Sequence, residues 1–214
     1  MLKIRIIKIA KNNAFLTKEL LLKNLPKGLQ KRAKRYLDEE SSLSYSAGRL
    51  LLKRALFENG LPALLIEEIS YSKEGKPSFI DHNFSISHSN GYVVLLFGTD
   101  ASIGIDIEKK KTIDLKLFSY LFTALEWTSI LDAENSLERF YWFWVRKEAL
   151  LKAAGCNLKD LKQLEVFEHY GTYKDKHYYF KSFNFDPDFN GIVATETQTA
   201  IAVEFVELKD LLEE

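Results

Sequence analysis

Alternating apolar and basic residues at positions 2–9 predict a strand with one buried face. Further along, apolar residues recur at helical spacing in some segments and alternate in others, which predicts a mixture of helices and strands. The expected helices cover residues 14–24, 27–37, 40–58 and 136–154, with two more within 114–133. The further strands are expected near residues 66–72, 83–87, 91–98, 102–108, 163–168, 177–185 and 199–207. Because helices precede strands in each half, the pattern predicts an α+β fold rather than a regular βαβ repeat.

Signals at the ends of helices support this assignment. Asn135 and Glu138 form an expected capping box before the helix at 136–154, and Gly155 is its expected end. Gly48 lies inside the helix at 40–58, where glycine costs about 1 kcal/mol relative to alanine. The glycine therefore indicates close approach by another element, most simply a strand packed on the helix.

Composition narrows the class of protein. The 214 residues form one large domain or two small ones, and we expect a boundary near residue 101, giving halves 1–101 and 102–214. Thirty basic and 30 acidic side chains leave no overall field that favours nucleic acid or an anionic membrane. No apolar run approaches the roughly 20 residues of a membrane span. A single cysteine, Cys156, excludes an internal disulfide, and we expect a cytoplasmic protein that binds neither nucleic acid nor membrane.

The strand at 102–108 carries two acids. Asp106 and Glu108 are two residues apart, so their side chains share one face of the strand at a distance of roughly 7 Å. Two neighbouring carboxylates repel one another, and a shared magnesium ion would relieve the repulsion. The alternative is a polar strand edge whose acids face water.

The helix at 136–154 carries a stripe of chemically distinct residues. Trp144, Glu148 and Lys152 are spaced four apart and lie on one side of the helix. Glu148 and Lys152 can simply form a surface ion pair. Because the neighbouring residues are rich in aromatic side chains, however, the helix is expected to be largely buried, and a buried charge needs a strong partner such as a metal.

Three further segments have polar groups suited to an anion. Gly75-Lys76-Pro77 is a turn with a fixed backbone, Ser87 and His88 cluster where a strand ends, and residues 27–35, including Lys31, carry only basic charges. Each has an ordinary alternative: a hairpin turn, a structural histidine and a solvated helix face. Glu126 likewise fits a capping box with Thr123.

The order and spacing of these segments resemble a known family. The runs GKP, FSISHS, GIDIE, FTALE and WVRKEALLK, within about residues 26–155, resemble the 4'-phosphopantetheinyl transferase superfamily, in particular its surfactin-synthetase-activating (Sfp) type. The resemblance implies a pseudo-dimer of two similar α+β halves in one monomeric chain, with the active site between them. It also implies a magnesium-dependent enzyme of the holo-[acyl-carrier-protein] synthase type. This enzyme would move the phosphopantetheine arm of coenzyme A to a serine of an apo acyl or peptidyl carrier protein and release 3',5'-ADP.

The resemblance also assigns roles by matching position. Residues 1–101 would contact the 3'-phosphate and adenine of coenzyme A, and residues 102–214 would hold magnesium and the carrier protein. The expected metal ligands are Asp106, Glu108 and Glu148. The expected contacts to coenzyme A are Lys31, Gly75, Lys76, Pro77, Ser87, His88, Lys147 and Lys152. The expected catalytic residues are Glu148 as first candidate for the base, Glu126 as second, and Lys152 for charge stabilisation.

Some alternatives stay open. Ser44 stands about where the family often has an arginine, and Arg49 follows Gly48 instead, so the exact 3'-phosphate contacts are open. The carrier protein is expected to bind near residues 114–133 and after Gly155, where Leu158, Leu161 and Leu164 form either a contact surface or core. The other candidate functions are a different magnesium-dependent phosphoryl or nucleotidyl transferase and a non-catalytic module that binds coenzyme A or a carrier protein. It is also open whether the carrier protein belongs to fatty acid, polyketide or nonribosomal peptide synthesis, how many different carriers the enzyme accepts, and whether it prefers magnesium or manganese.

Overall fold

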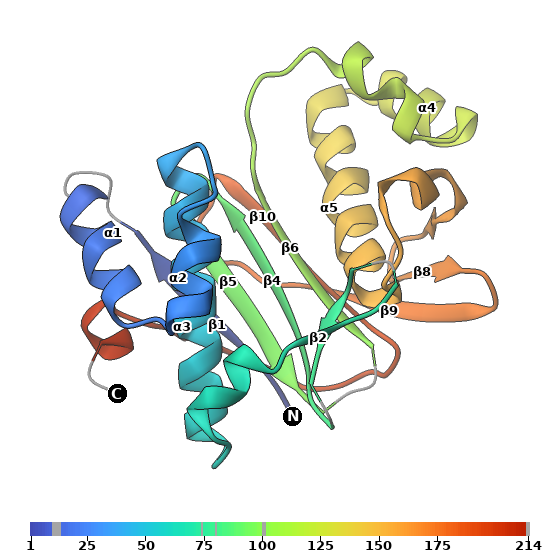
Figure 1. Cartoon of the computed structure of the whole chain (residues 1–214). Coiled ribbons are helices and arrows are strands. Elements are labelled where there is room, and N and C mark those ends of the chain that lie inside the picture. The colour runs from blue at the N-terminus through green and yellow to red at the C-terminus, as the bar shows by residue number, and fades with distance from the viewer. Residues whose placement is uncertain (10–13, 74, 80, 100–101, 213–214) are drawn as a thin grey trace. The chain divides into compact units, whose positions relative to one another are not determined.

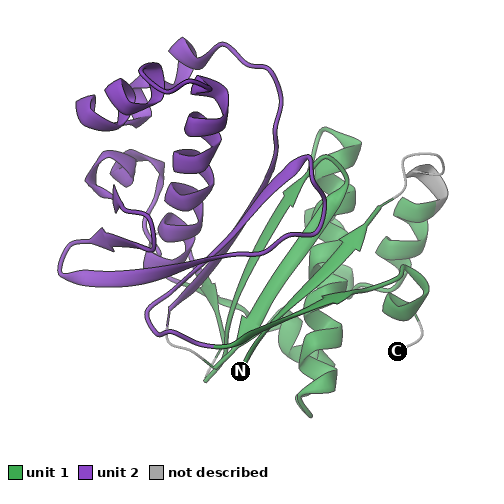
Figure 2. Ribbon diagram, turned by 180° about the vertical axis from the view of Figure 1, so that it is seen from behind, with its two compact units in different colours: residues 1–71, 77–99, 200–214 green, residues 72–76, 100–199 purple. Residues whose placement is uncertain are grey.

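The chain forms two units, each built around its own sheet (Figures 1 and 2). The structure, a computed structural model, describes residues 1–9, 14–73, 75–79, 81–99 and 102–212. The first unit consists of residues 1–71, 77–99 and 200–214, and the second of residues 72–76 and 100–199. The expected boundary at residue 101 lies outside the described residues. The expected halves differ from the two units in the segments 72–76 and 200–214.

The sheet of the first unit joins both ends of the sequence. Its strand order is β11-β1-β5-β4-β3-β2, in which β11 is parallel to β1 and the other neighbours are antiparallel. These strands are β1 (Leu2–Lys8), β2 (Ser70–Tyr71), β3 (Pro77–Ser78), β4 (Asn83–Ser89), β5 (Tyr92–Gly98) and β11 (Ile201–Phe205).

Helices of the first unit pack against this sheet through α3. They are α1 (Ala14–Lys23), α2 (Lys27–Ala33) and α3 (Glu39–Glu58), with 3₁₀ helices η2 (Ala63–Glu67) and η5 (Lys209–Leu211). A Cβ atom on Gly48 of α3 would lie 3.2 Å from the Ile86 side chain of β4, which confirms that the glycine permits helix–strand packing. The expected helix at 27–37 ends earlier, at Ala33.

A buried arginine ties three elements of the first unit together. Arg5 of β1 is only 1% exposed and donates to Glu58 at the end of α3. Arg54 donates to the same carboxylate at 2.7 Å, and Glu204 of β11 lies 3.8 Å from Arg5. Burial opposes ionisation of Glu58, but the hydrogen bonds from the two arginines hold its pKa below the ordinary value. The network therefore holds β11 and α3 to β1.

The second unit has an antiparallel sheet under one long helix. Its strand order is β6-β10-β9-β8-β7, and α5 packs on β6 and β10 (Figure 1). The strands are β6 (Ile103–Lys109), β7 (Glu165–Val166), β8 (Tyr170–Tyr173), β9 (Lys176–Ser182) and β10 (Phe189–Thr195). The helices are η3 (Leu115–Leu121), α4 (Ala124–Leu131), α5 (Ser136–Ala154) and η4 (Leu158–Gln163).

The α+β class is confirmed, whereas some individual elements differ from the sequence prediction. The long helix has the expected bounds, with Asn135 accepting from the Glu138 amide at its start and Gly155 in the left-handed region at its end. The strand expected at 66–72 is instead η2 followed by the short β2. The prediction did not include β8 or β10. Leu161 and Leu164 are core residues, while Leu158 is exposed.

Membrane spans are absent from the part of the chain that the structure describes, since none of its helices combines the necessary length and apolar character.

Close contact between α5 and β6 depends on Gly104. A Cβ atom on this residue would lie 2.1 Å from the Ala149 carbonyl oxygen and 2.5 Å from the Ala153 nitrogen. Both are backbone atoms of α5, so no side-chain rotation can make room. A larger residue at position 104 would have to push the helix away from the strand.

We therefore expect Gly104→Ala to lower the free energy of unfolding by about 1–3 kcal/mol or more, the usual cost of overpacking. Urea denaturation measures this change. The matched control is Gly28→Ala in α2, where the nearest atom to an added Cβ is 3.8 Å away and alanine favours the helix. Equal stability of the two variants would contradict the close contact.

Candidate active site

The acids of β6 face α5 while its isoleucines face the other way. Asp106 is 4% exposed and accepts a hydrogen bond from Lys152 Nζ to its Oδ1 at 2.8 Å. The same ammonium donates to the Ile105 carbonyl oxygen at 3.1 Å. Trp144 Nε1 lies 3.5 Å from Glu108 Oε1. The predicted residues of β6 and α5 therefore lie together in one part of the second unit.

Glu148 completes this group. Burial, together with the negative charges of Asp106 and Glu108, raises the pKa of Glu148 to about 7, although Lys152 opposes the shift. The carboxylates of Asp106, Glu108 and Glu148 are thus close enough to influence one another, and a single nearby ammonium does not balance them. We call these residues, with Lys152, the carboxylate cluster.

The carboxylate cluster fits a hard divalent cation by its donor chemistry. Among the described residues, no three His, Cys, Asp or Glu side chains already surround a common point, and Lys152 pairs with Asp106. Magnesium prefers carboxylate oxygens, and a bound cation would relieve the repulsion that raises the pKa of Glu148. The cluster has the right ligand atoms and an excess of negative charge.

Lys147 and Glu126 form an internal ion pair instead of facing the cluster. Lys147 is fully buried and donates to the carbonyl oxygens of Leu161 and Leu164 and to Glu126 Oε1, at 2.7, 2.9 and 2.9 Å. These contacts use the three hydrogens of its ammonium. The second oxygen of Glu126 accepts from the Thr123 amide in the predicted capping box. This geometry favours structural roles for both, in place of the expected contact with coenzyme A and the expected role as second base.

Lys76 caps the C-terminal end of α5. Its Nζ donates to the Ala153 carbonyl oxygen, and its side chain lies beside Gly155. Burial lowers the pKa of Lys76 to about 8. The preceding Gly75 has φ +91°, a conformation that suits glycine, and Pro77 opens β3. The expected adenine-side loop is therefore a well-defined turn whose lysine contacts α5.

The other expected contacts to coenzyme A belong to the first unit. Ser87 and His88 are neighbours on β4, with Ser87 buried and His88 exposed, as strand alternation requires. Lys31 is exposed on α2. Hydrogen bonds from Ser41 lower the pKa of Asp38, which caps α3, and the nearby His88 adds a smaller effect in the same direction.

Two arginines of the first unit stack on aromatic rings, which the sequence prediction did not foresee. Arg49 is nearly buried and lies 5.2 Å from the Tyr45 ring centroid. Arg32 lies 5.9 Å from the same ring and donates to the Tyr71 hydroxyl at 2.9 Å. Tyr45 and Arg49 are one turn apart on α3, whereas the contacts of Arg32 with Tyr45 and Tyr71 join separate elements.

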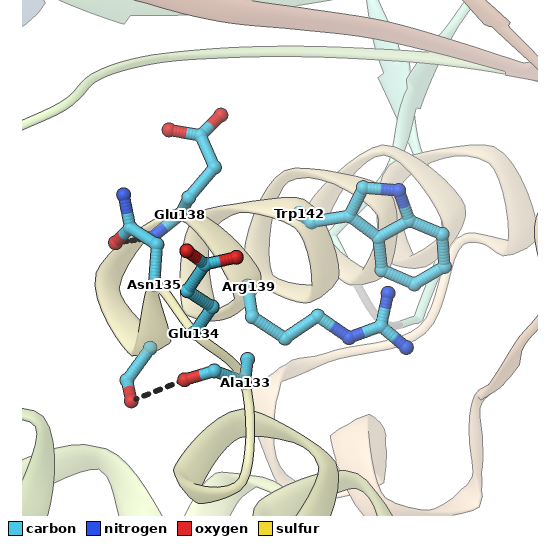
Figure 3. A pocket seen from close by; sticks show the side chains of 7 residues that line it. Ala133, Glu134, Asn135, Glu138, Arg139 and Trp142 are labelled. Carbon is cyan, nitrogen blue, oxygen red and sulfur yellow. Dashed lines mark hydrogen bonds between the residues drawn. The ribbon is translucent and has the colours of Figure 1, made fainter.

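A pocket of about 630 Å³ lies at the start of α5, lined by Ala133, Glu134, Asn135, Ser136, Glu138, Arg139 and Trp142 (Figure 3). Arg139 stacks on the Trp142 ring at 4.4 Å, and Arg146 lies 4.0 Å from the same ring. Burial lowers the pKa of Arg146 to about 10. None of the predicted site residues lines this pocket, so it is separate from the carboxylate cluster.

Comparison with known proteins gives a family match over the segment that contains the cluster. Residues 102–202 match the family model described as "4'-phosphopantetheinyl transferase superfamily". This segment of the chain is therefore similar to the 4'-phosphopantetheinyl transferase superfamily.

The relatives that the chain is similar to have consistent names. It is 37% identical over 90 residues to "4'-phosphopantetheinyl transferase Sfp" of Bacillus subtilis, covering 41% of this chain and 40% of the relative. It is 36% identical over 118 residues to "4'-phosphopantetheinyl transferase psf-1" of Bacillus pumilus, covering 50% and 48%. It is 33% identical over 138 residues to "4'-phosphopantetheinyl transferase AcpT" of Escherichia coli K12, covering 61% and 66%. The chain spans about half the length of the first two relatives.

The raised pKa of Glu148 predicts a pH-dependent stability. In the folded protein this pKa is about 7, against an ordinary value of 4.5. Between these two pH values the folded protein therefore keeps a proton on Glu148 that the unfolded chain has lost. Stability is therefore lost as pH rises through this window. Glu148→Gln cannot ionise and avoids the loss. We expect the melting temperature of the variant, relative to wild type in metal-free buffer, to be higher at pH 8 than at pH 4.5.

Differential scanning calorimetry with a chelator checks this expectation. Glu134→Gln, at an exposed position outside the cluster, is the matched control. A difference between Glu148→Gln and wild type that stays constant over this pH range would show that the Glu148 carboxyl is not destabilised by burial and its neighbours.

Proposed function

We propose that this protein is a magnesium-dependent 4'-phosphopantetheinyl transferase that modifies a serine of an apo acyl or peptidyl carrier protein with the phosphopantetheine arm of coenzyme A. The observation that carries this proposal is the carboxylate cluster, which joins Asp106 and Glu108 of β6 to Glu148 and Lys152 of α5. All four residues lie inside the segment that matches the superfamily. The identity and names of the relatives support the same reaction.

The residues of the cluster suit transfer of a phosphoryl-linked group. Asp106, Glu108 and Glu148 would hold magnesium, which when bound neutralises charge on the pyrophosphate of coenzyme A. Lys152, held between the β6 backbone and Asp106, is placed to stabilise negative charge on the transferred phosphate. In the reaction the serine oxygen bonds to the β-phosphorus, the bridging P–O bond breaks, and 3',5'-ADP leaves.

Glu148 is the first candidate for the group that receives the serine proton. A carboxylate oxygen can accept a proton from a hydroxyl group beside it, which suits a general base. Its two oxygens allow one to face a cation while the other accepts a proton. Glu126 is a weaker candidate because both of its oxygens already accept hydrogen bonds from Lys147 and Thr123.

The proposal assigns the nucleotide end of coenzyme A to Lys31, Ser87 and His88 of the first unit and to the turn at residues 75–77. Hydroxyl, imidazole and ammonium groups are suitable donors to a phosphate. The two units of one chain would then form a complete monomeric enzyme. Cys156 is buried and forms no disulfide, which suits a cytoplasmic location.

The carrier protein is proposed to bind at η3 and α4, within residues 114–133. Leu117 and Tyr120 of η3 are each 67% exposed, and Leu125 of α4 is 85% exposed. Large apolar side chains that remain this exposed are typical of protein–protein contact sites when they occur together. We call Leu117, Tyr120 and Leu125 the apolar surface of η3 and α4.

Intact-mass measurement of apo carrier proteins incubated with coenzyme A and magnesium tests the reaction. We expect a gain of the phosphopantetheine mass that a chelator abolishes. Asp106→Ala and Glu148→Ala should each lower the transfer rate by about 100-fold or more, as expected for loss of charge stabilisation. Near-wild-type transfer by both variants at saturating magnesium would exclude this assignment. Binding of coenzyme A without any transfer would instead indicate a non-catalytic binding module.

The apolar surface of η3 and α4 predicts a separable effect on the carrier protein. Leu117→Ser and Leu125→Ser should raise the KM for the carrier several-fold and leave the KM for coenzyme A unchanged, because neither residue belongs to the carboxylate cluster. Leu64→Ser, 68% exposed on η2, is the control. Steady-state kinetics with each substrate varied in turn measures both constants. If the KM for the carrier were unchanged even when Leu117→Ser and Leu125→Ser are combined, the carrier protein would have to bind at another surface.

A further inference from the structure

Asn190 of β10 lies directly across from Glu108 in the second unit. In the antiparallel pairing of β10 with β6, Asn190 faces Glu108 and Ile192 faces Asp106. Side chains of directly paired residues point to the same face of an antiparallel sheet, with Cβ atoms roughly 4.5–5.5 Å apart. Asn190 therefore shares the face of the sheet on which Asp106 and Glu108 meet α5.

The amide of Asn190 is buried without a hydrogen bond. Its Nδ2 is inaccessible to solvent and has no hydrogen-bond partner among the described residues. A buried donor left in this way is destabilising, and such groups in native proteins call for an explanation. Since solvent cannot reach the Nδ2 atom, a substrate group is a poor candidate for its acceptor. A protein oxygen that moves is a better one.

Glu108 provides that oxygen. Its carboxylate is the ionisable group paired with Asn190, and the indole of Trp144 from α5 already lies 3.5 Å from Glu108 Oε1. In sites that bind metals, ligand carboxylates are held by hydrogen bonds from neighbouring residues, which fix the direction of the ligand oxygen. An amide is suited to this task because it is neutral and leaves the charge of the site unchanged.

We propose that Asn190 is a positioning residue that donates from Nδ2 to the Glu108 carboxylate when a divalent cation occupies the carboxylate cluster. The hydrogen bond fixes one oxygen of Glu108 and directs the other to the cation. This role rests on the proposed function for the presence of the cation, but it concerns metal affinity and requires no transfer. Asn190 itself does not contact the reacting atoms.

Two substitutions of equal shape isolate the hydrogen bond. Asn190→Val and Asn190→Thr both introduce β-branched residues that suit a strand, and only threonine retains a donor. Binding of Mn²⁺ is measured by electron paramagnetic resonance, with and without coenzyme A. We expect Asn190→Val to weaken Mn²⁺ binding about 10-fold, the usual lower bound for loss of such a contact, and Asn190→Thr to weaken it less. Asn184→Val, at an exposed position, is the control and should bind Mn²⁺ as wild type does.

Thermal stability without metal separates this role from a structural one. Removing a buried donor that has no partner should leave the melting temperature of Asn190→Val unchanged or raise it, whereas loss of a structural contact would lower it. Equal Mn²⁺ affinity of wild type and Asn190→Val would overturn the inference, as would equal weakening by the valine and threonine variants. Wild-type protein that binds Mn²⁺ but transfers nothing would contradict the proposed function alone. No Mn²⁺ binding by wild type, even with coenzyme A, would contradict both.

Discussion

The depth at which α5 sits on β6 is the constraint on which the candidate site depends. Gly104 has no side chain to separate the backbones of the two elements at this position. With the helix in this position, Lys152 reaches both Asp106 and the Ile105 carbonyl oxygen, and Glu148 comes close to the carboxylates of β6. The absence of a Cβ atom at Gly104 thus allows the short distances between the side chains of β6 and α5 on which the electrostatics of the cluster depend.

The carboxylate cluster has an unfavourable distribution of charge, with more acidic than basic side chains. Three carboxylates share one ammonium, and burial together with this surplus of negative charge raises the pKa of Glu148. A few residues away on the same helix, the fully buried Lys147 is satisfied by two carbonyl oxygens and Glu126. The contrast is informative because the same helix contains one ionic group that neighbouring groups satisfy and another, Glu148, whose ionisation its surroundings oppose. Such unresolved charge is typical of functional sites.

Much of this organisation could be predicted from the sequence. The strand of Asp106 and Glu108 and the helix of Glu148 and Lys152 follow from local periodicity, and spacing alone places each pair on one face. Local pattern could not show where Lys147 points, since its partners lie 14 and 17 residues further along the chain. It also did not show β10, because the strand contains Asn190-Gly191, a pair typical of tight turns. The stacking of Arg32 on Tyr45 likewise depends on a contact between separate helices.

The parallel pairing of β11 with β1 has a consequence for how the chain is made. Residues 201–205 complete a sheet whose other strands are encoded before residue 99, and Arg5 stays without Glu204 until they are joined. During synthesis the second unit, from residue 100 to 199, therefore emerges whole before the first unit can close its sheet. The first unit thus begins earlier in the chain than the second and is completed later, and until β11 joins it the β1 edge of its sheet can pair with other strands.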